Sequence, residues 1–219
     1  MLEQESIYLR SIISSLDLPA GSRILNFGSQ RQSVLRYQPY IDDNIYGVAR
    51  TKQWKIVNFD LIEGPGVDLH GDIMEAGVFD RLKQGRFAAV FVFNVLEHLE
   101  NVGEICRRLE DLVSPGAYIV LSVPRKYPTH YDPIDNGFRP DVQQLVSSFP
   151  RSKMMDGAVV EDRTFGYYLL RNRRRLLKYL VRIGTPFFRP KNWWTQVLLL
   201  PYLFKRFQVS CVLLRRVGG

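Results

Sequence analysis

The ten residues Val90–Leu99, which read VFVFNVLEHL, decide the fold. They begin as an apolar run of β-branched and aromatic residues and turn polar at Asn94, Glu97 and His98. An apolar run of this length and composition is typical of a buried strand. The sequence therefore predicts a strand over residues 87–94 whose end is followed at once by polar side chains.

A helix and a second apolar run follow this strand. Residues 102–113 have helical character, residues 114–116 (Ser-Pro-Gly) interrupt it, and residues 117–123 form another buried run. Strand, helix and strand within roughly 35 residues make a βαβ unit, whose strands run parallel. Ligands of such sheets bind at the carboxyl ends of the strands. We therefore expect the chemistry at the edge where residues 94–98 lie.

The rest of the chain continues the alternation of strands and helices. Further strands are predicted over residues 23–27, 54–59, 67–69, 158–161 and 208–214, and helices over residues 5–16, 76–83 and 140–148, with one or two short helices in 31–53. This order implies an α/β fold with a doubly wound, mostly parallel, Rossmann-like sheet and flanking helices. A chain of 219 residues can build one such domain with an appendage.

Charge is unevenly distributed along the chain. Residues 163–219 hold 13 Lys and Arg, no Asp or Glu, and 11 of the 27 aromatic residues, whereas residues 1–162 hold 17 basic and 22 acidic residues. We therefore divide the chain into a core over residues 1–163, a basic, aromatic helical insertion over residues 164–206, and a last core strand over residues 207–219. A basic surface of this kind favours an anionic partner, either lipid headgroups or nucleic acid.

Cysteine and hydropathy patterns indicate the compartment. Cys106 and Cys211 lie far apart, and neither they nor the three histidines have the spacing of a zinc site, so no metal is predicted. Buried free thiols fit a reducing compartment. No run of 18 apolar residues is present, and the acidic N-terminus lacks a signal pattern. We expect a cytoplasmic protein, or one that is peripheral at the inner face of the membrane.

Several motifs occur in a family-specific order and spacing. They are Ile24–Gln30 (ILNFGSQ), Asp60, Gly71–Ile73 and Asn94–His98. In this order they resemble class I S-adenosylmethionine-dependent methyltransferases.

Two further segments resemble one branch of that family. Residues 59–72 and 128–140 are similar to small methyltransferase-domain proteins often associated with bacterial polysaccharide biosynthesis. The resemblance covers roughly residues 20–162. The resemblance to this branch implies that the chain transfers a methyl group to a carbohydrate.

The resemblance implies S-adenosylmethionine as the cofactor. The residues it assigns to the cofactor site are Asn26, Gly28, Ser29, Asp60, Leu61, Asp72, Ile73 and Asn94. In this assignment the loop after the first strand meets the amino-acid end of the cofactor, Asp60 accepts the ribose hydroxyls, and Asp72 with Ile73 takes the adenine. For Asp72 the alternative is a helix cap. The chain departs from the family pattern where Asn26 replaces the usual acid and Gln30 the usual last glycine.

Two histidines are candidate bases for oxygen methylation, which requires removal of a hydroxyl proton. A histidine, with an ordinary pKa of about 6.5, suits this role, and the candidates are His98 and His130. Asp132 and Asp135 lie near His130 and would orient an imidazole, and Arg139 would bind an anionic substrate group. The alternatives are a structural role for His98 and an internally salt-bridged loop.

A basic stripe in the predicted insertion indicates a surface partner. The residues Arg171, Arg174, Arg175, Lys178 and Arg182 fall on one helical face, opposite leucines and near aromatic residues. This pattern is typical of a helix lying in a membrane interface. The alternatives are a packed subdomain with a solvated basic face and, with no recognised module to support it, nucleic-acid binding.

The function that these observations predict is S-adenosylmethionine-dependent methylation of an oxygen on a sugar or glycan intermediate, free or lipid-linked. The alternatives are a non-catalytic binding module on a methyltransferase scaffold and an RNA methyltransferase. Nothing in the sequence predicts an oligomeric state.

Overall fold

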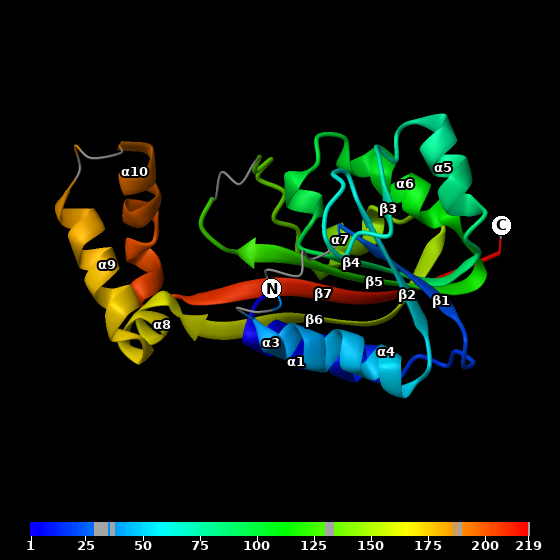
Figure 1. The fold of residues 1–219 in the computed structure, drawn as a ribbon, viewed down its shortest axis with the longest axis horizontal. Helices are drawn as coiled ribbons and strands as arrows, with labels where there is room; N and C mark the ends of the chain where they lie inside the picture. Colours follow the sequence, from blue (N-terminus) through cyan, green and yellow to red (C-terminus); the bar gives the residue numbers. More distant parts are fainter. Residues whose placement is uncertain (29–34, 36–37, 130–133, 186, 188–189, 219) are drawn as a thin grey trace.

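The computed structural model describes residues 1–28, 35, 38–129, 134–185, 187 and 190–218. Seven strands form one mixed sheet in the order β3-β2-β1-β4-β5-β7-β6 (Figure 1). The strands are β1 (Arg23–Phe27), β2 (Lys55–Asp60), β3 (Leu69–His70), β4 (Phe87–Phe93), β5 (Val113–Lys126), β6 (Ser152–Thr164) and β7 (Arg206–Arg216). Strands β1 to β5 pair in parallel, and β7 runs antiparallel to both of its neighbours. The predicted Rossmann-like α/β class is confirmed.

Helices cover both faces of the sheet (Figure 1). One face packs against α1 (Glu3–Ser14), α3 (Pro39–Ile41), the π-helix η1 (Asp42–Tyr46) and α4 (Gly47–Thr51), and the other against α5 (Ala76–Lys83), α6 (Val102–Leu112) and α7 (Val142–Ser147). Leu9 and Phe91 are buried on the first face, and Leu109 and Val90 on the second. Because alternate β4 side chains enter these two cores, the whole strand is apolar.

Strand pairing extends several strands beyond the predicted bounds. β5 begins at Val113 and includes Ser114–Gly116, which the sequence predicted as a break. The ladder with β4 absorbs the interruption as a register shift between Phe87 and Ala89. β6 is likewise longer than predicted because it pairs with β7 along almost its full length. Local signals therefore underestimate strands whose hydrogen bonds come from distant segments.

In the described part of the chain between β6 and β7, four helices project from one end of the sheet (Figure 1). They are α8 (Phe165–Arg171), α9 (Arg173–Gly184), α10 (Pro190–Leu198) and the 3-10 helix η3 (Leu200–Leu203), and we call residues 165–205 the helical extension. Thr164 and Arg206 are partners in the β6–β7 ladder, so the helical extension starts and ends at the carboxyl edge of the parallel strands.

Asn172 separates α8 from α9. Its side chain accepts a hydrogen bond from the backbone N–H of Arg175 and caps the start of α9. Arg171 therefore ends a different helix, and the predicted five-residue basic stripe was wrong at that residue. Four of its members remain together on α9.

Candidate active site

The loop after β1 requires a glycine at its first position. Gly28 has φ +72°, and a Cβ there would lie 2.3 Å from Cγ2 of Val95. Its N–H donates to the carbonyl of Phe59 at 2.9 Å. The carboxyl ends of β1, β2 and β4 therefore lie close together at one edge of the sheet, as the order of the motifs predicted.

Asn26 belongs to a buried polar network at the end of β1. Its amide nitrogen donates to Tyr46 Oη and to Asn58 Oδ1, each at 2.9 Å, and Tyr46 Oη donates to Asn58 Oδ1 at 3.0 Å. Burial raises the pKa of Tyr46 to about 12. Both amide hydrogens of Asn26 are used inside the protein, so its carbonyl oxygen is the group left for a ligand.

The end of β2 places a carboxylate beside exposed apolar surface. Oδ1 of Asp60 accepts from the backbone N–H of Ile62 at 3.2 Å, and Oδ2 has no hydrogen bond to any described residue. Leu61 is 63% exposed and Ile62 57% exposed. A free carboxylate oxygen next to bare aliphatic side chains can bind a sugar's hydroxyls and a flat ring together.

The segment after β3 places Asp72 in a turn three residues before Glu75, the N-cap of α5. The Asp72 side chain accepts from the backbone N–H of Met74 at 2.8 Å, which fixes the turn that leads into α5. The residue is nevertheless exposed at the edge. Ile73 is 3% exposed and packs in the core, and its carbonyl accepts from Arg108. Ile73 therefore anchors the turn, and little of its side chain remains for a ring to contact.

Asn94 ends β4 and is tied to the first helix. It has φ +53°, the left-handed conformation that asparagine tolerates better than most residues. Its amide donates to Oε1 of Glu5 at 2.8 Å, and Oε2 of Glu5 accepts from the backbone N–H of Leu2 at 2.8 Å. Glu5 is 1% exposed. Glu5 was not among the residues predicted for the site, although an acid on the apolar stripe of a helix was a usable signal.

Glu97 and His98 stand side by side in the 3-10 helix η2 (Leu96–His98). Nδ1 of His98 lies 2.5 Å from the carbonyl oxygen of Ile134, and Nε2 lies 3.8 Å from Oε1 of Glu97. A nitrogen this close to a carbonyl oxygen must carry the proton, so we assign the lone pair of the neutral ring to Nε2. His98 can therefore accept a proton on the side of Glu97.

Glu97 is a buried acid with an unusual titration. It is 1% exposed, and burial raises its pKa to about 7, against the lowering effects of its own backbone N–H, His98 and Arg139. Its Oε2 has no hydrogen-bond partner among the described residues. Perturbed acids of this kind concentrate at functional sites. The sequence placed Glu97 at the edge but gave it no role.

Hydrogen bonds from Asn136 attach the loop after β5 to η2 and the residue that follows it. The side-chain amide of Asn136 donates to the carbonyls of Leu96 and Leu99, and its backbone N–H donates to that of Glu97. Arg139 pairs with Asp135 at 2.5 Å and donates to the carbonyl of Phe138. The predicted substrate-binding residues Asp135 and Arg139 thus hold each other, which is the salt-bridged alternative.

Four residues singled out in the sequence, Ser29, Gln30, His130 and Asp132, lie outside the described residues. Within the described part of the chain, no three His, Cys, Asp or Glu side chains form a group that could hold a metal ion.

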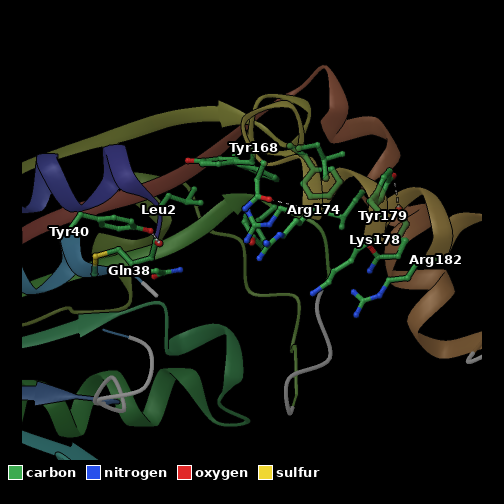
Figure 2. Close-up of a pocket in the computed structure, with 17 residues that line it drawn as sticks. Leu2, Gln38, Tyr40, Tyr168, Arg174, Lys178, Tyr179 and Arg182 are labelled. Carbon is green, nitrogen blue, oxygen red and sulfur yellow. Dashed lines mark hydrogen bonds between the residues drawn. The ribbon is translucent and has the colours of Figure 1, made fainter. Parts of the chain in front are cut away.

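A cavity of about 820 Å³ lies between the helical extension and the carboxyl edge. Figure 2 shows its two walls: the body contributes Leu2, Gln38 and Tyr40, and the helical extension contributes Tyr168, Arg174, Lys178, Tyr179 and Arg182. Tyr127 of the body also lines the cavity. Gln38 and Tyr40 follow β1 and Tyr127 follows β5, so the cavity opens at the same edge as Gly28 and Asn94. None of the assigned cofactor residues that are described lines it, so the cavity lies beside that group rather than within it.

Comparison with known proteins gives a family match over most of the chain. A family described as a methyltransferase domain matches residues 1–193. No curated protein matches the sequence.

Solved structures share the fold at low sequence identity. The (4+2)-cyclase SpnF has a TM-score of 0.58 at 15% identity, over 97% of this chain and 81% of that one. Coclaurine N-methyltransferase, bound to N-methylheliamine and S-adenosylhomocysteine, has a TM-score of 0.55 at 11% identity, over 96% and 72%. Phosphoethanolamine N-methyltransferase 2 of Haemonchus contortus has a TM-score of 0.54 at 12% identity, and this chain spans 53% of its length. At these identities the likeness shows the fold alone.

Glu97 predicts a pH-dependent stability. Because its pKa is raised from 4.5 to about 7, the stabilisation from its neutral form is complete below about pH 4.5 and is lost as the pH rises through about 7. Glu97→Gln should therefore unfold like the wild type near pH 4 and be more stable by about 3 kcal/mol near pH 8. Denaturant unfolding at the two pH values measures this difference.

The matched control for this prediction is Glu100→Gln, which removes the same charge from an exposed position three residues away. It should follow the wild type at both pH values. Equal pH dependence of unfolding in wild type and Glu97→Gln would show that ionisation of Glu97 does not reduce the stability of the folded protein.

Proposed function

The chain belongs to the methyltransferase-domain family and is an S-adenosylmethionine-dependent methyltransferase, and on that premise we propose that it methylates a hydroxyl oxygen of a lipid-linked sugar or glycan. The observation that carries the proposal is the cavity of about 820 Å³ beside the cofactor edge. Pockets for small ligands span roughly 300–1,000 Å³, so a saccharide unit fits. The rings of Tyr40, Tyr127, Tyr168 and Tyr179 give this cavity apolar faces with hydroxyl groups, which suits a sugar.

The carboxyl edge has the features that the cofactor needs. Gly28 lets backbone approach where any side chain would strike Val95. Asp60 would hold the ribose hydroxyls with its free carboxylate oxygen, and the exposed Leu61 would cover the adenine. Asp72 is exposed at the same edge. When bound, S-adenosylmethionine supplies an electrophilic methyl group, and these residues fix where it is presented.

His98 is the base that the geometry favours. Its Nε2 carries the lone pair and would take the hydroxyl proton of the acceptor. The imidazolium formed in this way would lie 3.8 Å from Oε1 of Glu97. Burial raises the pKa of Glu97 to about 7, and a positive charge on His98 opposes that rise. Glu97 would act through His98, by stabilising its charged form in a buried setting.

The segment after β4 supports an oxygen acceptor over a nitrogen acceptor. Asn94 is followed by Val95 and Leu96, where amine- and base-modifying enzymes carry an Asn/Asp-Pro-Pro-aromatic motif. An acceptor hydroxyl needs a base during attack, which His98 can provide.

The outer surface of the helical extension supports attachment to an anionic membrane. Leu177, Leu180 and Val181 of α9 are more than half exposed, and Phe187 and Phe204 are 96% and 88% exposed. Cations accompany these apolar side chains, since Arg171, Arg173 and Lys205 are also exposed. Apolar side chains beside cations suit a lipid interface. None of the described helices is long and apolar enough to cross a bilayer.

The first test of the proposed function is cofactor affinity. Asp60→Ala removes a carboxylate at the cofactor edge and should weaken S-adenosylhomocysteine binding by about tenfold, the loss of one or two hydrogen bonds to a charged group. Calorimetry measures this change. Asp17→Ala is the control, because Asp17 is exposed at the opposite edge of the sheet, before β1. No binding by the wild type up to millimolar ligand would refute the cofactor site.

The second test concerns the base. His98→Ala should lower the rate of methyl transfer to a lipid-linked saccharide fraction on the order of 10²–10⁴-fold, because the proton then has no acceptor. The affinity for S-adenosylhomocysteine should be retained. Radiolabelled methyl transfer measures the rate, and His70→Ala, which changes an exposed histidine, is the control. Transfer at the wild-type rate by His98→Ala would exclude His98 as the base.

The third test is vesicle co-sedimentation. Wild type should bind vesicles that contain phosphatidylglycerol more than neutral ones. Replacing Leu177, Leu180 and Val181 by Gln should weaken that binding by about tenfold or more, since apolar burial is lost. Met155→Gln is the control, because Met155 is exposed at the far end of β6. Wild type that stays in the supernatant with anionic vesicles would contradict the attachment.

A further inference from the structure

The cavity wall formed by α9 carries four cations. Arg174, Arg175, Lys178 and Arg182 all line the cavity. Arg174, Lys178 and Arg182 follow each other at i, i+4 and i+8, so they form a row of roughly 12 Å along one side of the helix. Figure 2 shows Lys178 and Arg182 extending from α9 into the open space.

Among the described residues, these cations have no partner of opposite charge. Within the described residues, none of the four makes an ion pair or a side-chain hydrogen bond, and no Asp or Glu lines the cavity. The nearby acid Asp162 is 3% exposed and is held by Gln4, Arg163 and Tyr168. Four adjacent cations repel one another, so an anion bound among them would relieve that repulsion.

The opposite wall of the cavity is neutral and polar. Gln38 lines this wall, and its buried Oε1 has no hydrogen-bond partner among the described residues. Tyr40 donates to the carbonyl of Met1 at 3.1 Å, and burial raises its pKa to about 12, so it stays uncharged. The cavity thus has a cationic wall on α9 and a neutral wall on the body.

We propose that α9 binds a phosphate or diphosphate group of the acceptor, with Arg174, Lys178 and Arg182 as its ligands. A diphosphate presents several anionic oxygens in a row, which a row of three cations can match with charge-assisted hydrogen bonds. The saccharide joined to it would lie toward Gln38 and Tyr40, at the carboxyl edge. This inference rests on the proposed function, because it names the chemical class of that acceptor: a sugar phosphate or diphosphate ester.

Two sources could supply such a group, and the choice of probes separates them. Inorganic pyrophosphate tests the anion site alone. Geranyl diphosphate adds a short isoprenoid tail and represents a lipid-linked acceptor, whereas UDP-glucose represents a soluble one. All three should bind, and the tighter of the last two identifies the source.

The experiment measures the affinity of the full chain for these probes by calorimetry, in the presence of S-adenosylhomocysteine. The double variant Lys178→Gln/Arg182→Gln should weaken pyrophosphate binding by about tenfold or more. The matched control is Arg171→Gln/Arg173→Gln, which removes the same charge from the helical extension at residues that do not line the cavity. The control should stay within about twofold of wild type.

Each result decides the inference. Equal losses in both double variants would mean diffuse attraction and overturn the site. Wild type that binds S-adenosylhomocysteine but not pyrophosphate would overturn the site and leave the proposed function standing. Wild type that binds pyrophosphate but not S-adenosylhomocysteine would support the anion site and refute the proposed function. Single-stranded RNA that displaces pyrophosphate at physiological salt and depends on Lys178 and Arg182 would make this wall a nucleic-acid surface and overturn the inference.

Discussion

The antiparallel strand β7, inserted between β5 and β6, is the constraint on which the site depends. It pairs with β5 from Arg215 to Gln208 and with β6 from Arg216 to Arg206. β6 runs parallel to β5, so the chain leaves β6 at the carboxyl edge. β7 runs in the opposite direction, so the chain must return at the same edge. Any segment between these strands is therefore held at the carboxyl edge next to the end of β5, and strand pairing rather than a local motif makes the helical extension a wall of the cavity.

The same edge holds two buried acids at a cost in stability. Glu5 offsets the cost of its burial with hydrogen bonds from Asn94 and Leu2, so it fixes the first helix over the end of β4. Glu97 is less well compensated, since one of its oxygens has no partner among the described residues. A neutral residue of the same shape would be more stable there at neutral pH. The arrangement makes sense if the charge of Glu97 is needed when His98 takes up a proton.

The sequence predicted those structural features that are determined by residues close together in the chain. The buried run of β4, the helix after it and the run of β5 have local signatures, and all three were found. The break between α8 and α9 was missed because it depends on one side chain. Asn172 lies among arginines, and its side chain caps the start of α9. The Asp135–Arg139 pair was predicted only as an alternative, since sequence alone does not show whether an arginine meets a ligand or its neighbour.

Helix α9 explains why the chain concentrates both cations and exposed apolar residues in one segment. The residues of α9 fall on three sides of the helix. Tyr179 is buried, Arg174, Lys178 and Arg182 line the cavity, and Leu177 and Leu180 are exposed. A helix that simply lay on a membrane would direct its cations to the headgroups. Here the cations line a cavity, so lipid attachment would rely on the apolar side and on the few basic residues outside the cavity. The proposed attachment would resist salt more than a basic stripe would. It would also bring the membrane surface next to the cationic wall, where an acceptor anchored by a lipid tail would present its phosphate.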